Sequence, residues 1–321
     1  MNYELLIGKA AACGAGSGYK FAQYHNAFQI VGAADTTTVH CSLFTVHYSL
    51  FTIHCSLFPF IFSVFLSLLM RNLKIYISYR GTAYHGWQRQ DNNITVQEIV
   101  EGVMSRIMNA PVTVHGCSRT DAGVHARRFC FSTIVDNAIP CTGLVRAMNA
   151  MLPGDIAVLS CEDMPGDFHA RFSAKGKEYV YVVNTAPVRD VFAGDLMLHY
   201  PYRLDEERLD RAAKLFVGTH DFAAFCKAES VKLHKTTVRT IYDYSVQRNG
   251  HTVTFTVSGD GFLHNMVRIT VGTLIYINEG KRTEEDIERS LTTGVREYAG
   301  ITIPAHGLYL NRVFYPEEGE I

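Results

Sequence analysis

The chain has 321 residues, with 30 lysine and arginine residues against 31 aspartate and glutamate residues. Apolar residues make up 47% and charged residues 19%, a composition that excludes an intrinsically disordered chain. The net charge of −1 excludes a uniformly basic nucleic-acid binder, so any basic surface has to be a local patch. The length exceeds that of one compact core and favours two lobes, or one large α+β unit with an extra segment.

The first seventy residues differ from the rest of the chain. Residues 38–58 contain three near-identical heptads, and the apolar run Leu57–Met70 has 14 residues. A membrane anchor needs a run of about 20 residues, and a secretory signal needs a basic region ahead of the apolar one, which this segment lacks. We therefore expect translation to begin at Met70, with residues 1–69 a non-native or disordered extension.

The elements expected in the first half begin with a strand over Leu73–Tyr79, where apolar and polar residues alternate. Thr95 to Glu98 resembles a capping box, and the apolar residues that follow recur at helical spacing. Strand-forming residues and breakers then predict strands Pro111–His115, Phe129–Val135 and Ile156–Cys161, and a helix Leu144–Leu152.

In the second half, alternation predicts a strand over Lys177–Asn184, and two further strands are predicted to form a hairpin around Asn249-Gly250. The elements expected there are the hairpin strands Arg239–Arg248 and His251–Ser258 and the helices Asp205–Val217, Phe262–Ile277 and Glu284–Thr292. This order predicts an α+β fold of two lobes with antiparallel sheets. The junction is expected between Asp167 and Ser173.

Eight cysteines are present, none in a Cys-x-x-Cys pair or at a zinc-like spacing with histidine. We expect reduced thiols in a cytoplasmic protein.

The run from Arg119 to His125 places a carboxylate, a guanidinium, an imidazole and a glycine in one loop between strands. Active sites are often built on such loops. Asp121 could also cap its own turn, as aspartate does wherever it clusters with glycine. On the chemistry of the run alone, the capping interpretation is favoured, because nothing in the run demands catalysis.

The run Ser118–Ala126 resembles the signature loop of TruA-like tRNA pseudouridine synthases, and further matches follow in order along residues 71–321. They are Gly86–Gln90, Leu152–Ile156, Asp167–Ala174, Tyr179–Tyr181, His264–Arg268 and Gly307–Leu310. The resemblance implies the pseudouridine synthase fold, which is of class α+β. In this fold two α/β-sandwich-like lobes with antiparallel sheets meet at a central catalytic cleft. The lobes would be residues 70–172 and 173–321 of this chain. It also implies a homodimer that binds tRNA, with no cofactor, metal or membrane.

The reaction that the resemblance implies is isomerisation of uridine to pseudouridine at positions 38, 39 and 40 of the anticodon stem-loop, after the base is flipped out. Asp121 would be the nucleophile or a stabiliser of the sugar cation, kept ionised by Arg268. Tyr179 would pack on the uracil, and Arg119 would stabilise the flipped nucleotide. Further substrate contacts are expected from Arg89, His125 and Arg171, and from a wider basic patch of Arg127, Arg128, His169, Lys175, Lys177, Lys227, Lys232, Lys235 and Arg239.

The chain departs from the family pattern at Arg80, Cys117-Ser118, Arg128-Phe129 and Asp260. Three rival hypotheses stay open. The first is a catalytically silent RNA-binding protein on the same fold. The second is a glycoside or nucleoside hydrolase that pairs Asp121 with Asp260. The third is a membrane-anchored module, which predicts that truncation at Met70 abolishes function.

Overall fold

The structure is a computed structural model that describes residues 70–232 and 236–316, all within one compact unit. The heptads and most of the apolar run before Met70 lie outside the described residues. The strands are β1 (Arg71–Tyr79), β2 (His115–Gly116), β3 (His125–Val135), β4 (Ile156–Met164), β5 (Gly176–Asn184), β6 (Leu198–His199), β7 (Gly218–Asp221), β8 (Val238–Asn249), β9 (Thr252–Gly259) and β10 (Leu308–Phe314). The α-helices are α3 (Val96–Met108), α4 (Cys141–Met151), α5 (Glu206–Ala213), α6 (Ala228–Val231), α7 (Met266–Asn278) and α8 (Glu284–Thr293).

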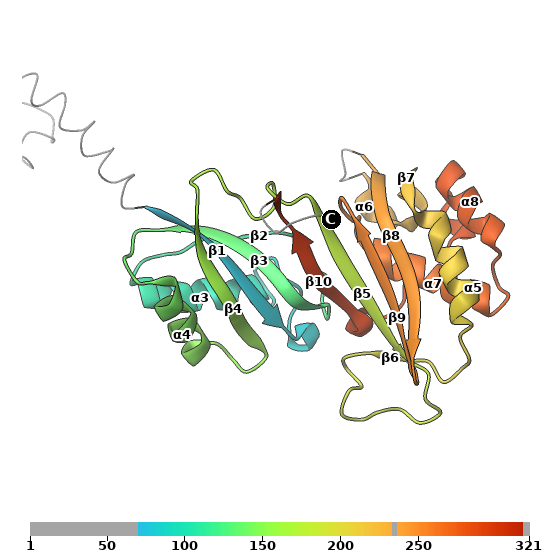
Figure 1. Ribbon diagram of the computed structural model, residues 1–321, viewed down its shortest axis with the longest axis horizontal. Helices are drawn as coiled ribbons and strands as arrows, with labels where there is room; N and C mark the ends of the chain where they lie inside the picture. Colours follow the sequence, from blue (N-terminus) through green and yellow to red (C-terminus); the bar gives the residue numbers. More distant parts are fainter. Residues whose placement is uncertain (1–69, 233–235, 317–321) are drawn as a thin grey trace, which may run out of the picture. The chain divides into compact units, whose positions relative to one another are not determined.

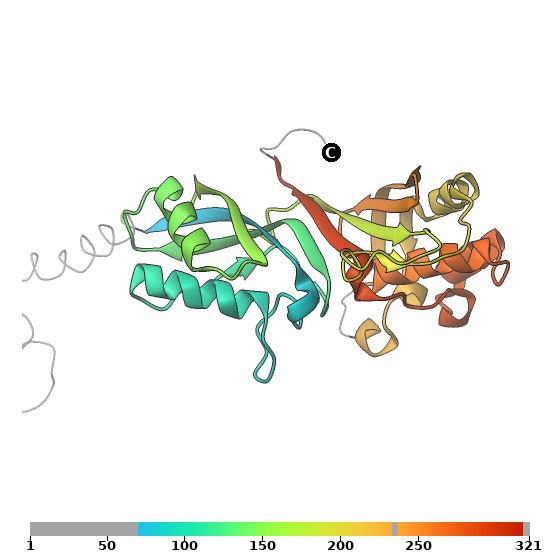
Figure 2. The ribbon, with the colours of Figure 1, turned by 90° about the horizontal axis from the view of Figure 1, so that it is seen from below.

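These strands form one mixed sheet in the order β4-β1-β3-β10-β5-β9-β8-β7, with β2 on β3 and β6 on β5. Neighbours are antiparallel except for the pairs β3–β10 and β5–β6. Helices α3 and α4 cover the β1–β4 end of the sheet, and α5, α7 and α8 cover the β7–β9 end (Figure 1). Figure 2 shows α3 and α7 on the same side of the strands. The expected α+β class with mainly antiparallel pairing is confirmed.

In the first half, most of the expected elements are present. Helix α3 begins after Thr95, whose hydroxyl accepts a hydrogen bond from the Glu98 N–H, as the capping pattern predicts. The prediction of a strand over Pro111–His115 is wrong, because only His115 and Gly116 pair with β3. Residues 111–114 lie under α3, where the Glu101 carboxylate accepts the Val114 N–H in place of a neighbouring strand.

In the second half, β8 and β9 form the expected hairpin, and Gly250 adopts a left-handed conformation with φ of 61° in the turn. The predicted helix Asp205–Val217 is shorter, since α5 passes into a 3₁₀ turn at Lys214–Phe216. Helix α7 begins at Met266 instead of Phe262. Asn265 precedes it with φ of 63°, and this left-handed residue prevents the helix from extending further back.

Strand β10 was not predicted as a strand, yet it joins the two halves of the sheet. It pairs in parallel with the start of β3 and antiparallel with β5. One continuous sheet therefore runs through the two expected lobes, and the boundary between 172 and 173 stays a prediction. Because β3 follows the Arg119–His125 loop and β5 carries Tyr179, β10 sets the distance between these two parts of the site.

Within the part of the chain that the structure describes, every helix is too short or too polar to cross a lipid bilayer.

Candidate active site

The loop that carries Asp121 lies between β2 and β3 and is fixed mainly by its backbone. The Val124 N–H donates to the Asp121 carbonyl at 3.1 Å, which closes a turn around Gly123. The Thr120 carbonyl accepts the Trp87 N–H at 3.3 Å. Gly86 has φ of 83°, and a Cβ atom there would lie 2.2 Å from the Thr120 carbonyl oxygen. Glycine is therefore required for residues 86 and 87 to approach the loop this closely.

The Asp121 carboxylate lies opposite two nitrogen groups from the start of α7. Its Oδ2 is 3.5 Å from Nη1 of Arg268, and its Oδ1 is 3.4 Å from Nε2 of His264. The Asp121 side chain is 28% exposed, and that of Arg268 is 17% exposed. This ion pair orients the carboxylate, while the exposed fraction leaves the carboxylate accessible to a substrate.

Both nitrogen groups are positioned by other hydrogen bonds. Arg268 donates from Nε to the Ile303 carbonyl at 2.7 Å and from Nη1 to Oδ1 of Asn265 at 2.8 Å. His264 Nδ1 is 2.7 Å from the Ser230 hydroxyl. The sequence predicted the proximity of Arg268 to Asp121 but did not select His264, although His264 opens the same motif.

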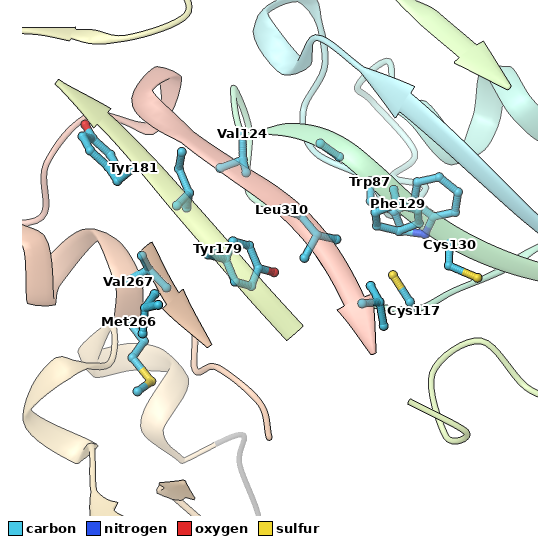
Figure 3. Close-up of a cluster of buried hydrophobic side chains, with 14 of the residues drawn as sticks. Trp87, Cys117, Val124, Phe129, Cys130, Tyr179, Tyr181, Met266, Val267 and Leu310 are labelled. Atoms are coloured by element: carbon cyan, nitrogen blue, oxygen red, sulfur yellow. The ribbon is translucent and has the colours of Figure 1, made fainter. Parts of the chain in front are cut away.

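Tyr179 projects from β5 between Leu310 of β10 and Met266 and Val267 of α7 (Figure 3). Its hydroxyl lies 3.3 Å from the Ser118 hydroxyl, in the loop that carries Asp121. Burial raises the pKa of Tyr179, so its hydroxyl keeps its proton at neutral pH.

The Tyr179 side chain is nevertheless only 6% exposed, and Phe262 packs against its ring edge-on with 5.0 Å between ring centroids. In this state the ring offers little free surface for a uracil. Tyr181 is fully buried and donates from its hydroxyl to the Pro304 carbonyl at 2.7 Å. It therefore acts as the core neighbour of Tyr179.

Three predicted substrate-binding arginines lie at the surface, at different places. Arg119 is exposed on the loop that carries Asp121. Arg89 is also exposed, and its Nη2 forms an ion pair with Glu101 at 3.1 Å. Arg171 is exposed after β4, with its guanidinium 5.6 Å from the ring centroid of Phe172. Arg119 thus lies nearest to Asp121 along the chain, and Arg89 already has an acidic partner.

His125 does not fit the predicted substrate contact, because its imidazole is 1% exposed. The Gly81 N–H donates to Nδ1 at 2.9 Å, so Nδ1 carries no proton. Nε2 must then carry the proton, and it donates to the His306 carbonyl at 3.1 Å. Burial lowers the pKa of His125, so the imidazole stays neutral with its proton on Nε2. His125 therefore connects backbone segments and has no ring nitrogen available for a phosphate.

The wider basic patch is only partly available as free positive charge. The guanidinium groups of Arg127 and Arg128 stack over tyrosine rings at 4.9 and 4.3 Å from the ring centroids. Lys227 forms an ion pair with a neighbouring glutamate at 3.2 Å. Lys177 is half-buried, and burial lowers its pKa. Lys235 lies outside the described residues.

The departures from the family pattern have local partners. Arg80 forms an ion pair with Asp195 at 2.7 Å. Cys117 is fully buried, and burial raises the pKa of its thiol to about 11, so it stays a protonated, apolar side chain. The Asp260 carboxylate accepts the Thr240 N–H at 3.0 Å, a bond that joins β8 to the end of β9. Asp260 thus has a structural role in the sheet.

Among residues 70–232 and 236–316, no cluster of three or more His, Cys, Asp or Glu side chains has a geometry that could hold a metal ion.

Comparison with known proteins gives consistent matches. A family model described as tRNA pseudouridine synthase matches residues 75–173 and 212–316. Three curated proteins named tRNA pseudouridine synthase A are similar to this chain. The one from Acetivibrio thermocellus is 43% identical over 246 residues, which is 77% of this chain and 100% of the relative. The one from Thermoanaerobacter sp. is 40% identical with the same coverage. The one from Citrifermentans bemidjiense is 42% identical over 252 residues, covering 78% of this chain and 99% of the relative.

A crystal structure of a Cbf5-Nop10-Gar1 complex gives a TM-score of 0.33 at 14% identity, covering 74% of this chain and 48% of that one. This likeness is too low to indicate a shared fold or function.

Proposed function

The chain belongs to the tRNA pseudouridine synthase family, and from this premise we propose that it converts uridine to pseudouridine at positions 38, 39 and 40 of the tRNA anticodon stem-loop. Asp121 acts as the nucleophile, and the reaction needs no cofactor. The observation that carries the proposal is the partly exposed Asp121 carboxylate, 3.5 Å from Arg268 and beside the loop contact to Tyr179.

The reaction is an isomerisation in which the atoms of the product are those of the substrate. The bond from N1 of uracil to the sugar carbon breaks, the base turns, and C5 bonds to the same carbon while the C5 proton leaves and N1 gains one. A carboxylate can serve this exchange by attacking the sugar carbon or C6 of the base. Arg268 orients the Asp121 carboxylate before the base arrives, since two other hydrogen bonds already fix the position of its guanidinium.

The target base must leave the RNA stack to reach Asp121. Arg119, exposed on the same loop, is placed to fill the vacated space or to bind a phosphate. The Tyr179 ring becomes the stacking surface for uracil once Phe262 moves from its edge-on contact. Substrate entry is therefore coupled to a local rearrangement of the segment between β9 and α7.

The test is release of tritium from tRNA transcripts that carry [5-³H]uridine, with the parent protein compared with Asp121→Asn. This substitution retains the size of the side chain and removes its charge. We expect turnover by the parent and none by the variant, with tRNA binding retained in both. Transcripts that keep a single uridine at position 38, 39 or 40 test the positions. Binding without turnover by the parent would favour the catalytically silent RNA-binding protein.

The same assay tests the expected start at Met70. A chain begun there should match the full chain, whereas the membrane-anchored hypothesis requires loss of function. The homodimer and the cytoplasmic location also belong to this proposal. Sedimentation equilibrium of the free protein measures the association state, and cell fractionation followed by immunoblotting measures the location.

A further inference from the structure

Three aromatic rings lie in a row outside the Asp121 site. The rings of His115 and His169 stack with 5.2 Å between their centroids, and those of His169 and Phe172 follow at 4.4 Å. Phe172 ends the row and is 75% exposed. This large apolar ring is therefore accessible to a partner.

Hydrogen bonds fix the turn that holds the row. The His169 N–H donates to the Ser173 hydroxyl at 3.0 Å, and the Ser173 N–H donates to the His169 carbonyl at 2.9 Å. The Arg171 N–H donates to Nδ1 of His169 at 3.1 Å, and the Ala170 N–H donates to the Ser132 hydroxyl at 3.1 Å. The turn that carries Phe172 is therefore ordered before any partner binds, which lowers the entropic cost of binding.

The row lies close to the catalytic loop along the chain. His115 pairs with Ser132 of β3 and precedes Asp121 by six residues, a span of at most about 20 Å. A short stretch of RNA spans this distance, so one RNA can contact both places.

Positive charge accompanies the rings. The Arg171 guanidinium lies 5.6 Å from the Phe172 ring centroid, and Lys175 is exposed four residues further along the chain. Aromatic faces beside cations are the combination that binds unpaired bases together with their phosphates. Phe192 is even more exposed, at 92%, yet the described part of the chain records no ring packed against it. Exposure alone thus does not distinguish Phe172.

We propose that His115, His169 and Phe172 form a stacking platform for an unpaired base of the RNA substrate, other than the base at Asp121, with Arg171 on the adjoining phosphate. The platform extends the proposed function, since it requires that the chain act on tRNA. Any base can stack on such a surface, so the platform supplies affinity and register along the strand.

The test measures binding of the full chain to labelled tRNA by fluorescence anisotropy. Phe172→Ala should weaken binding roughly 5- to 150-fold, the range for losing one base–aromatic stack, and Phe172→Trp should restore it. Phe192→Ala is the matched control and should change binding less than twofold. Because a phenyl ring neutralises no phosphate, Phe172→Ala should leave the salt dependence unchanged, whereas Arg171→Ala should lower its slope by about one.

A scan of abasic substitutions through the RNA then identifies the stacked base. The loss caused by Phe172→Ala should disappear for RNA that lacks one particular unpaired base. An equal loss with every abasic RNA, or a Phe172→Ala affinity equal to that of Phe192→Ala, would overturn the platform. A change in the sedimentation of the free protein, with no change in RNA affinity, would assign the rings to a contact between two copies of the chain instead.

These outcomes are separable from failure of the proposed function. The platform is measured by binding, so it can be present in a protein that forms no pseudouridine. Conversely, turnover with normal affinity in Phe172→Ala would leave the proposed reaction intact and remove the platform. Phe172 is largely exposed, so thermal unfolding of the variant should match the parent and exclude misfolding as the cause.

Discussion

Replacement of Arg268 by glutamine tests whether the ion pair with Asp121 is the centre of the site. The substitution removes a positive charge 3.5 Å from the Asp121 carboxylate and also the donors to the Ile303 carbonyl and the Asn265 side chain. At 3.5 Å, two unit charges attract by about 1 kcal/mol at the dielectric constant of water and by about 5 kcal/mol at an effective value of 20. Because both side chains are partly exposed, we expect the attraction between Asp121 and Arg268 to be roughly 1–3 kcal/mol.

If this attraction stabilises the reacting carboxylate, Arg268→Gln should lower kcat/KM roughly 5- to 150-fold. Arg268→Lys keeps the charge and should lose less. The loss of donors to Ile303 and Asn265 should also lower the free energy of unfolding by about 2–4 kcal/mol. A double-mutant cycle with Asp121→Asn, measured by urea denaturation, separates the ion pair from the other contacts of Arg268.

The cycle isolates the ion pair because Asp121→Asn removes the charge without removing the partners of Arg268. The coupling energy should be about 1 kcal/mol or more and should fall as salt is added. A destabilisation by Arg268→Gln that is the same in both backgrounds, within about 0.3 kcal/mol, would refute the reasoning. Arg268 would then be a structural residue of α7.

Three further predictions concern the loop and its surroundings. Burial lowers the pKa of His125 below 6.5, so the unfolded chain binds a proton that the folded chain does not. The stability of the folded protein therefore falls as pH drops below about 6.5. Thermal unfolding measured between pH 7.5 and 5 should show a smaller decline in stability for His125→Gln than for the parent. Gly86→Ala should lower the free energy of unfolding in urea by about 1–3 kcal/mol, because the new Cβ meets the Thr120 carbonyl. The control Gly102→Ala, whose new Cβ meets open space on α3, should be neutral or stabilising. Tyr179→Phe should retain tRNA binding but lower single-turnover rates by about 10²-fold if the hydroxyl transfers a proton, and an unchanged rate would limit Tyr179 to packing.

The elements that the sequence predicts well are those whose signals are local. Thr95 and Glu98 define the start of α3 because the cap is made by residues three apart. Asn249 and Gly250 define the β8–β9 turn because glycine tolerates positive φ. Strand β10 has no such signal. Its pairing partners are more than a hundred residues away in sequence, and the alternation over Leu308–Phe314 is interrupted by a bulge near Leu310.

The residues of the candidate site likewise include some that the sequence predicted and some that it missed. Asp121, Arg268 and Tyr179 were selected from motif resemblance, and the structure brings all three to neighbouring positions, although their roles stay predictions. His264 was missed because its relevance depends on a spatial contact to Asp121 that no local pattern encodes. His125 was misassigned because its position in a polar loop suggests exposure, whereas the fold buries it.

The burial of His125 explains how a loop in one half of the sheet is aligned with residues from the other half. Its Nδ1 accepts from Gly81, its Nε2 donates to His306, and its ring stacks on Tyr309 with 4.8 Å between centroids. His306 lies in the 3₁₀ turn Ala305–Gly307 directly before β10, and Tyr309 lies in β10, which pairs with β5 beside Tyr179. The imidazole thus connects the Asp121 loop to β10 and, through the pairing of β10 with β5, to Tyr179. Loss of the His125 imidazole should change the distance between Asp121 and Tyr179 and leave both side chains in place. His125→Ala should therefore lower turnover more than tRNA affinity. An equal loss of turnover and affinity would argue against this connection.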